Sequence, residues 1–146
     1  MGAANGSGGV CPQVKVLNDT LVYINQGGKR KGAGTVALPV WHNDIVDFLD
    51  IQTEVGDPRS KSFDIQPQIT FNDLFMQKKE EDKNGVWITV CPHEVREKLG
   101  IVLPECYNED FVEAYSKIEK AVDSGVLKVF TKHKIIDLWR KYLQVF

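Results

Sequence analysis

The chain has 146 residues, with 18 basic and 20 acidic side chains and a formal net charge of −2. Hydrophobic residues make up 42% of it and charged residues 26%, which is typical of a folded domain. These values argue against a disordered chain and against a globally basic nucleic-acid binder. No apolar run approaches the roughly 20 residues that a transmembrane helix needs, so we expect no transmembrane segment.

The first twelve residues are small and rich in glycine, which predicts a flexible tail over 1–12. Gly2 leaves N-myristoylation open, although Gly6 stands where the usual motif has Ser or Thr. The start of the chain lacks the apolar stretch of a secretory signal. An odd number of widely spaced cysteines is not a disulfide framework. We therefore expect a cytoplasmic protein. The cysteines are Cys11, Cys91 and Cys106.

Residues 14–40 carry the pattern of a β-hairpin or β-meander. Two short β-rich runs, 14–16 and 21–24, flank Asn18-Asp19, a pair typical of turns. A third run covers 35–40. Between these runs lies a basic loop flanked by glycines, whose charged residues are Lys29, Arg30 and Lys31.

The middle of the chain predicts one helix followed by strands. Apolar residues at helical spacing and three aspartates predict a short amphipathic helix over 43–54. Residues 62–71 alternate around Pro67 and predict one or two short strands. A helical turn is expected at 72–76, and 86–90 is the clearest strand of the sequence.

The last third of the chain is predominantly helical in pattern. We expect a short helix over 93–99, a longer one over 108–122 capped by Asn108, and a final helix over 131–144. Residues 126–130 fit either a strand or the start of that last helix. The whole chain therefore predicts the α+β class in one packed unit. Its parts are the tail 1–12, a β-rich part 13–91 and a helical extension 92–146.

The order hairpin, helix and further strands resembles the ubiquitin-like β-grasp domains, and among them the doublecortin type. This resemblance implies a β-grasp fold over residues 14–90 and a cytoskeletal association. The residues that carry it are Val14-Lys15-Val16 with Asn18-Asp19, Lys31-Gly32, Ile45-Val46-Asp47-Phe48-Leu49, Thr70-Phe71-Asn72-Asp73-Leu74 and Val86-Trp87-Ile88-Thr89-Val90.

Motifs for nucleotides and calcium are incomplete. Residues 32–37 match a dinucleotide fingerprint, but Leu38-Pro39 is a poor opening for the helix that would face the pyrophosphate. Gly27 and Gly32 have P-loop spacing without the Lys-Ser/Thr pair that holds phosphate. Residues 80–85 resemble the start of a calcium loop, but its twelfth position is Cys91 rather than a bidentate Glu.

Zinc and thiol chemistry also lack a full set of residues. Cys91, His93 and Cys106 offer three soft ligands without the two tight pairs of a structural zinc site. Cys91 has His93 close by but neither an orienting group nor a local signature of a cysteine nucleophile. We therefore predict no enzyme, no catalytic residue, no cofactor and no metal. A cysteine- or zinc-dependent enzyme is the third hypothesis.

The near-zero net charge conceals local charge of both signs. Residues 44–57 are acidic, whereas 117–146 carry seven basic and three acidic residues. The sequence thus favours a non-catalytic scaffold or protein-interaction module with an acidic protein partner, and self-association through the C-terminal helix. The alternative is a small RNA- or single-stranded-DNA-binding protein, cellular or viral, with an OB-like barrel over 14–91. The predicted contact residues are Lys29, Arg30, Lys31, Lys134, Trp139, Arg140 and Tyr142.

Overall fold

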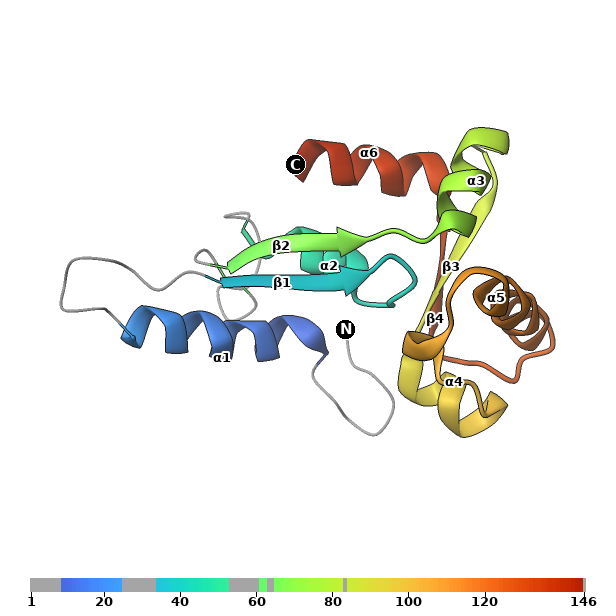
Figure 1. Ribbon diagram of the computed structural model, residues 1–146, viewed down its shortest axis with the longest axis horizontal. Coiled ribbons are helices and arrows are strands. Elements are labelled where there is room, and N and C mark those ends of the chain that lie inside the picture. The colour runs from blue at the N-terminus through green and yellow to red at the C-terminus, as the bar shows by residue number, and fades with distance from the viewer. Residues whose placement is uncertain (1–8, 25–33, 53–60, 63–64, 83, 146) are drawn as a thin grey trace.

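The computed structural model describes residues 9–24, 34–52, 61–62, 65–82 and 84–145 (Figure 1). Helices and short strands alternate along this part of the chain, so the predicted α+β class is confirmed. Among the described residues no helix is both long and apolar enough to cross a membrane. In chain order the elements are α1 (Val10–Tyr23), β1 (Gly34–Pro39), α2 (Ile45–Leu49), β2 (Ile65–Thr70), α3 (Asp73–Glu81), β3 (Val86–Val90), α4 (Pro92–Leu99), the 3-10 helix η3 (Leu103–Glu105), α5 (Asn108–Asp123), β4 (Phe130–Lys134) and α6 (Ile135–Val145).

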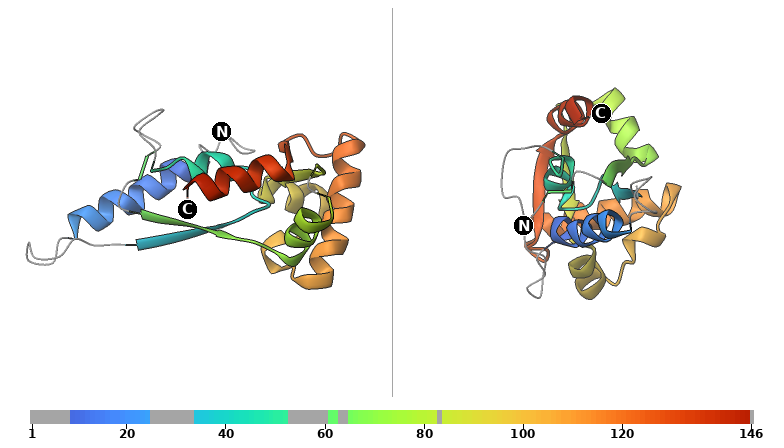
Figure 2. Two further views of the ribbon diagram at one scale, coloured as in Figure 1. Left: turned by 90° about the horizontal axis from the view of Figure 1, so that it is seen from above. Right: turned by 90° about the vertical axis from the view of Figure 1, so that its left-hand side faces the viewer.

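The first four elements, α1, β1, α2 and β2, form what we call the parallel unit. Its strands pair in parallel, from Gly34 opposite Ile65 to Pro39 opposite Thr70. Figure 2 shows α1 and α2 on the same side of this two-stranded sheet. A side-chain carbon at Gly34 would lie 2.7 Å from Cδ1 of Leu21, so α1 approaches the sheet closely there. The other face of the sheet is exposed and carries small or polar side chains, namely Thr35, Ala37, Gln66, Gln68 and Thr70.

The elements α3, β3, α4, α5 and β4 form the antiparallel unit. Its strands pair antiparallel, from Val86 opposite Lys134 to Val90 opposite Phe130. Helix α5 turns one apolar stripe inward, as expected from residues three and four positions apart. The buried residues of that stripe are Phe111, Ala114, Tyr115, Ile118, Ala121 and Val122.

An aromatic cluster fills the centre of the antiparallel unit. The fully buried ring of Trp87 stacks on Tyr115, with ring centroids 4.6 Å apart, and meets Phe75 edge-on at 5.1 Å. Both arrangements are favourable for aromatic pairs. The hydroxyl of Tyr115 accepts a hydrogen bond from the backbone N–H of Ile88 at 3.2 Å, which ties α5 to β3.

The segment after β1 joins the two units. The backbone N–H of Val90 donates to the carbonyl of Trp41 at 2.9 Å, and the N–H of Asn43 donates to the carbonyl of Val90 at 3.0 Å. The indole of Trp87 donates to the carbonyl of Val40 at 3.2 Å. These bonds extend β3 onto the parallel unit, so the two units share one core.

Helix α6 packs against both units. It contacts α2 of the parallel unit and α3 of the antiparallel unit. Lys141 forms an ion pair with Asp50 at 2.9 Å. The ring of Phe71 lies 5.5 Å from Trp139 and 4.8 Å from Tyr142, measured between ring centroids. The apolar stripe predicted for the C-terminal helix is therefore packed largely within the molecule.

The structure corrects the predicted hairpin near the start of the chain. Residues 14–23 lie in α1, where Cys11, Val14 and Asn18 are buried at spacings of three and four. That spacing is helical, whereas a half-buried strand would alternate. The predicted turn at Asn18-Asp19 is helix interior, and the β-grasp details are not confirmed. Helix α1 already begins at Val10, inside the predicted tail, and residues 1–8 lie outside the described residues.

Three further predictions differ in their boundaries. The helix predicted over 43–54 is observed only over Ile45–Leu49, and 53–60 lies outside the described residues. The turn predicted at 72–76 continues as the nine-residue α3. The final helix begins at Ile135 rather than at 131, because the preceding residues pair with β3 as a strand.

The strand predicted over 86–90 and the helix predicted over 108–122 are confirmed. The predicted cap at Asn108 is wrong, because Asn108 is the first helical residue and Tyr107 occupies the cap position. The helix predicted over 93–99 is also observed, and it ends at Gly100 in the left-handed conformation, with φ of 68°. Glycine is favoured there because it carries no Cβ. The predicted division of the chain at residue 92 stays a prediction.

Candidate functional site

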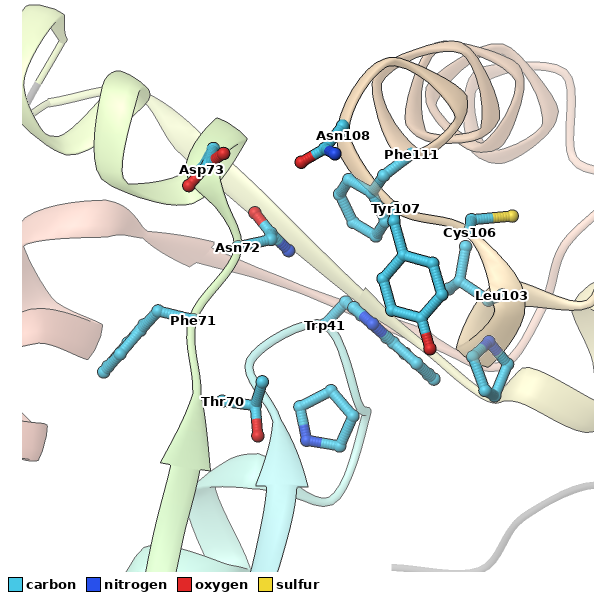
Figure 3. Close-up of a pocket in the computed structure, with 12 residues that line it drawn as sticks. Trp41, Thr70, Phe71, Asn72, Asp73, Leu103, Cys106, Tyr107, Asn108 and Phe111 are labelled. Carbon is cyan, nitrogen blue, oxygen red and sulfur yellow. The ribbon is translucent and has the colours of Figure 1, made fainter.

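A pocket of about 370 Å³ opens where the parallel strands end (Figure 3). Pro39 at the end of β1 and Thr70 at the end of β2 form one side of it, and the start of α5 forms the other. Ligands of open parallel sheets are commonly bound beyond the carboxyl ends of the strands. The residues that line the pocket are Pro39, Trp41, Thr70, Phe71, Asn72, Asp73, Leu103, Pro104, Cys106, Tyr107, Asn108 and Phe111.

Apolar side chains make most of the wall. Trp41, Leu103 and Phe111 are all buried in the shared core and present one edge to the pocket. Tyr107 stands at the mouth and is 71% exposed. Such a wall of rings and aliphatic groups with a few polar atoms is typical of small-molecule sites.

Two helices begin at the pocket. Asn72 caps α3, since its side-chain oxygen accepts a hydrogen bond from the N–H of Phe75 at 2.8 Å. At the start of α5, Tyr107 occupies the cap position without a side-chain hydrogen bond. Asn108, the first residue of α5, has a φ of 52°, which is uncommon for a residue other than glycine. Free backbone N–H groups at both helix starts make this region rich in hydrogen-bond donors.

Acidic groups surround the donors. Asp73 lies in the first turn of α3, and Glu109 and Asp110 lie in the first turn of α5. The Cys106 thiol reflects this environment: burial raises its pKa, and the carboxylates of Asp110 and Glu105 raise it further. The pocket therefore opposes negative charge while it offers hydrogen-bond donors.

A second polar cluster lies between the units, with Asn43 and Thr89 buried and Thr131 and His133 partly buried. The side-chain oxygen of Asn43 accepts hydrogen bonds from the hydroxyls of Thr89 at 3.2 Å and Thr131 at 2.9 Å. The Thr89 hydroxyl also lies 3.1 Å from Nε2 of His133, whose pKa is lowered by burial. This cluster links β3 and β4 to the segment after β1. Its hydrogen bonds hold these segments together, so its role is structural.

Neither Cys11 nor Cys106 gives a sign of an activated thiol. Burial and the carboxylates of Asp47 and Asp44 raise the pKa of Cys11 to about 11, so it is protonated at neutral pH. Within the described ranges, no three His, Cys, Asp or Glu side chains are grouped to hold a metal ion.

The predicted contact residues do not converge on the pocket. Lys134 and Arg140 are exposed, while Trp139 and Tyr142 are partly buried against Phe71. The ammonium of Lys79 lies 4.2 Å from the ring centroid of Trp139, which covers that ring further. A binding role for these residues stays a prediction. Three other predicted contacts lie outside the described residues, namely Lys29, Arg30 and Lys31.

Sequence reasoning missed the pocket although it noted several of its pieces. Asn72 and Asn108 were recognisable before predicted helical segments, and Trp41 follows a predicted strand. The useful signal is that Trp41 and Asn72 each come two residues after the end of a strand. Nothing in the sequence shows that the start of α5 lies opposite them.

Comparison with known proteins gives one consistent result. All 146 residues match the family model described as ribonucleotide reductase, barrel domain. The chain is 49% identical over 128 residues to ribonucleoside-diphosphate reductase subunit alpha of Synechocystis sp., which covers 86% of this chain and 16% of that protein. It is 40% identical over 144 residues to the subunit of the same name from Chlamydia trachomatis, covering 99% of this chain and 13% of that protein. The Helicobacter pylori J99 subunit is 36% identical over 142 residues, covering 97% and 17%. The chain thus spans less than a fifth of the length of these curated relatives.

These likenesses overturn several predictions. The relatives are reductase subunits, so the predictions of a non-catalytic scaffold and of no enzyme are wrong. The resemblance to ubiquitin-like and doublecortin domains is also wrong, and so is the cytoskeletal association that it implied. The alternative of an RNA- or DNA-binding protein receives no support from any of the relatives described here.

Proposed function

Since the chain belongs to the ribonucleotide reductase barrel-domain family, we propose that it forms part of the α subunit of a ribonucleoside-diphosphate reductase. The observation that carries this proposal is the match along the whole chain, with up to 49% identity to the relatives described above. The substrate class follows from the relatives' names: a ribonucleoside diphosphate.

The parallel unit has features of a barrel wall. In barrels built from parallel strands and helices, the helices form the outer layer and the strands enclose the interior. Here α1 and α2 lie on one side of β1 and β2 (Figure 2), and the opposite face carries Thr35, Ala37 and Gln66. Two strands cannot close a barrel, so the remaining strands would come from other parts of a longer polypeptide.

We assign the wall of the reaction chamber to this segment and the reacting groups to the rest of the subunit. Reduction needs an electron source, and a thiol that acts as one reacts most readily as its thiolate. The pKa of Cys11 is about 11 and that of Cys106 is also raised by burial. Neither thiol is therefore prepared for such a role.

The name subunit alpha implies a further subunit in the relatives, and we propose that this protein also works with one. Exposed Lys134 and Arg140 are the described candidates for contact with an acidic partner surface. Self-association through α6 and a cytoplasmic location remain part of the same proposal.

A chimera tests the proposed function. In the Synechocystis α subunit, the segment that matches this chain is replaced by the chain itself. We expect the purified chimera to reduce ribonucleoside diphosphates at a rate within about tenfold of the parent, since segments at this identity share their core. The measurement is deoxyribonucleotide formation with the cognate second subunit and reductant present.

The control is the same chimera with Trp87→Ala, which removes the central ring of the antiparallel unit. It should lose both activity and thermal stability. A chimera that folds with the parent's melting temperature but forms no deoxyribonucleotide would contradict the proposal.

A further inference from the structure

The indole N–H of Trp41 lacks a hydrogen-bond partner at the pocket. Trp41 is 6% exposed, and its Nε1 donates to no group among the described residues. The indole of Trp87, by contrast, donates to the carbonyl of Val40. Among the described residues, the buried side-chain oxygen or nitrogen without a partner is Oγ of Ser62, so the Trp41 N–H is not sealed in the core but reaches the solvent of the pocket. Trp41 lines the pocket together with Asn72 and Tyr107, as Figure 3 shows.

Asn72 supplies a second donor. Its Oδ1 is held by the N–H of Phe75, which fixes the orientation of the amide. The Nδ2 group therefore points away from α3 and toward the pocket, as Figure 3 shows. It donates to no group in the described part of the chain. Both donors line the same pocket, so an acceptor group bound there has two hydrogen-bond donors available.

The charges around the pocket select against an anion. Asp73 lines the pocket, Glu109 and Asp110 follow in the first turn of α5, and no basic residue is among those that line it. A ribonucleoside diphosphate would bring its phosphates against these carboxylates. The pocket is therefore distinct from a site for the proposed substrate.

The walls suit a flat group. Tyr107 at the mouth and Phe111 behind it offer aromatic surface, and Leu103 and Pro39 close the sides. The volume of about 370 Å³ lies in the lower part of the range for small-molecule sites. A single ring with one substituent fits that volume better than a long chain or a large cofactor.

From these contacts we propose that the pocket binds a neutral, planar ring bearing a hydrogen-bond acceptor, as in an aromatic carboxamide. The carbonyl oxygen of the ligand accepts hydrogen bonds from Nε1 of Trp41 and Nδ2 of Asn72. The ring packs against Tyr107. This inference concerns a site outside the proposed reductase chemistry. A failure of benzamide binding would therefore leave the proposed reductase function untouched, and the reverse also holds.

Titration of the full chain with benzamide tests the inference. The three tryptophans give three indole N–H signals in a ¹H–¹⁵N correlation spectrum, and the Trp41 signal is the one missing from Trp41→Phe. We expect benzamide to move this signal downfield saturably, with a dissociation constant in roughly the millimolar range for so small a ligand. Benzoate should bind at least tenfold more weakly because of its charge. Toluene, which has the ring but neither an acceptor nor a charge, should produce no downfield shift of this signal.

Asn72→Asp is the matched variant. The carboxylate keeps the cap on α3 but removes the Nδ2 donor. We expect about tenfold weaker benzamide binding, the loss of one hydrogen bond, at an unchanged melting temperature. The inference is overturned if benzamide gives no saturable shift at Trp41, if benzoate binds as tightly, or if Asn72→Asp binds benzamide as well as the parent.

Discussion

In the antiparallel unit Trp87 and Phe75 are completely buried, whereas Tyr23 at the end of α1 in the parallel unit is 88% exposed. The contrast extends over whole surfaces. The antiparallel unit surrounds its aromatic cluster with α3, α5 and two paired strands. The parallel unit leaves one sheet face open. It also exposes apolar side chains along α1, including Val16, Leu17 and Val22.

This difference distinguishes a core that is complete within the chain from a surface that a larger structure would cover. A hydrophobic helix face and a bare strand edge are both costly to leave in water. The chain covers only 13–17% of the relatives described above, so most of such a structure would lie outside it. Substitutions in the two units should consequently differ in cost.

The largest expected effect is that of Trp87→Ala. The substitution removes ring contacts with Tyr115 and Phe75 and the hydrogen bond to Val40. We expect a loss of about 3–5 kcal/mol in the free energy of unfolding, or a fall of roughly 10 °C in melting temperature. Denaturant unfolding followed by circular dichroism measures it.

Tyr23→Ala is the control in the parallel unit, with an expected change below about 0.5 kcal/mol because Tyr23 is exposed. Equal losses for the two variants would show that both units are equally complete, contrary to the comparison.

A smaller effect is expected at the junction of the units. Asn43→Ala deprives the hydroxyls of Thr89 and Thr131 of their shared acceptor. The expected cost is about 1–3 kcal/mol, as for other buried groups left unpaired. Thermal unfolding of Asn43→Ala, Thr131→Val and the double variant measures the coupling between the two side chains.

Since Thr131 loses its partner in Asn43→Ala, Thr131→Val should cost less in that background than in the parent. Strict additivity would mean that the two side chains do not act together. Gln66→Ala, on the exposed sheet face, serves as a control that should change stability very little.

The same division explains what the sequence could reveal about the fold. Helix α5 and strand β3 follow from local patterns, a helical apolar stripe and an unbroken β-rich run, and both belong to the antiparallel unit. In α1 only Cys11, Val14 and Asn18 are buried. Val16 and Val22 are exposed, and these β-branched residues led to the prediction of strands there. A helix with an uncovered apolar side lacks the amphipathic pattern that identifies helices.

Strand β4 was not predicted, for another reason. Its residues Thr131 to Lys134 are polar or charged, and they precede the strong apolar stripe that begins at Ile135. Local pattern assigned them to the helix, while pairing with β3 makes them a strand. Such tertiary pairing cannot be read from propensity alone.

The candidate site was unpredictable as a whole because its parts are distant in sequence. Trp41, Asn72 and Tyr107 each follow or precede a predicted element, yet only the packing of α5 beside the ends of β1 and β2 brings them together. The family was missed for a different reason. The hairpin on which the β-grasp resemblance depended is the helix α1, so the resemblance started from a wrong element.

The smallest expected effect is the dependence of stability on pH, which compares one histidine from each side of the junction. Burial lowers the pKa of His42, although the carboxylate of Asp44 opposes that shift, and burial alone lowers the pKa of His133. In the unfolded chain both have a pKa of about 6.5. Below that pH the unfolded state binds more protons than the folded state, so stability falls as the pH drops from 7 until the folded pKa values are passed.

Matched variants separate the two histidines. Nδ1 of His42 accepts a hydrogen bond from the N–H of Asp44 at 3.1 Å, and His42→Asn keeps an acceptor there. His133→Gln keeps a polar group near Thr89. Each variant should flatten the fall in melting temperature between pH 7 and pH 5, and the double variant should flatten it most. A slope that neither substitution changes would place the proton uptake elsewhere, and would remove the histidines from the account of how the two units are held together.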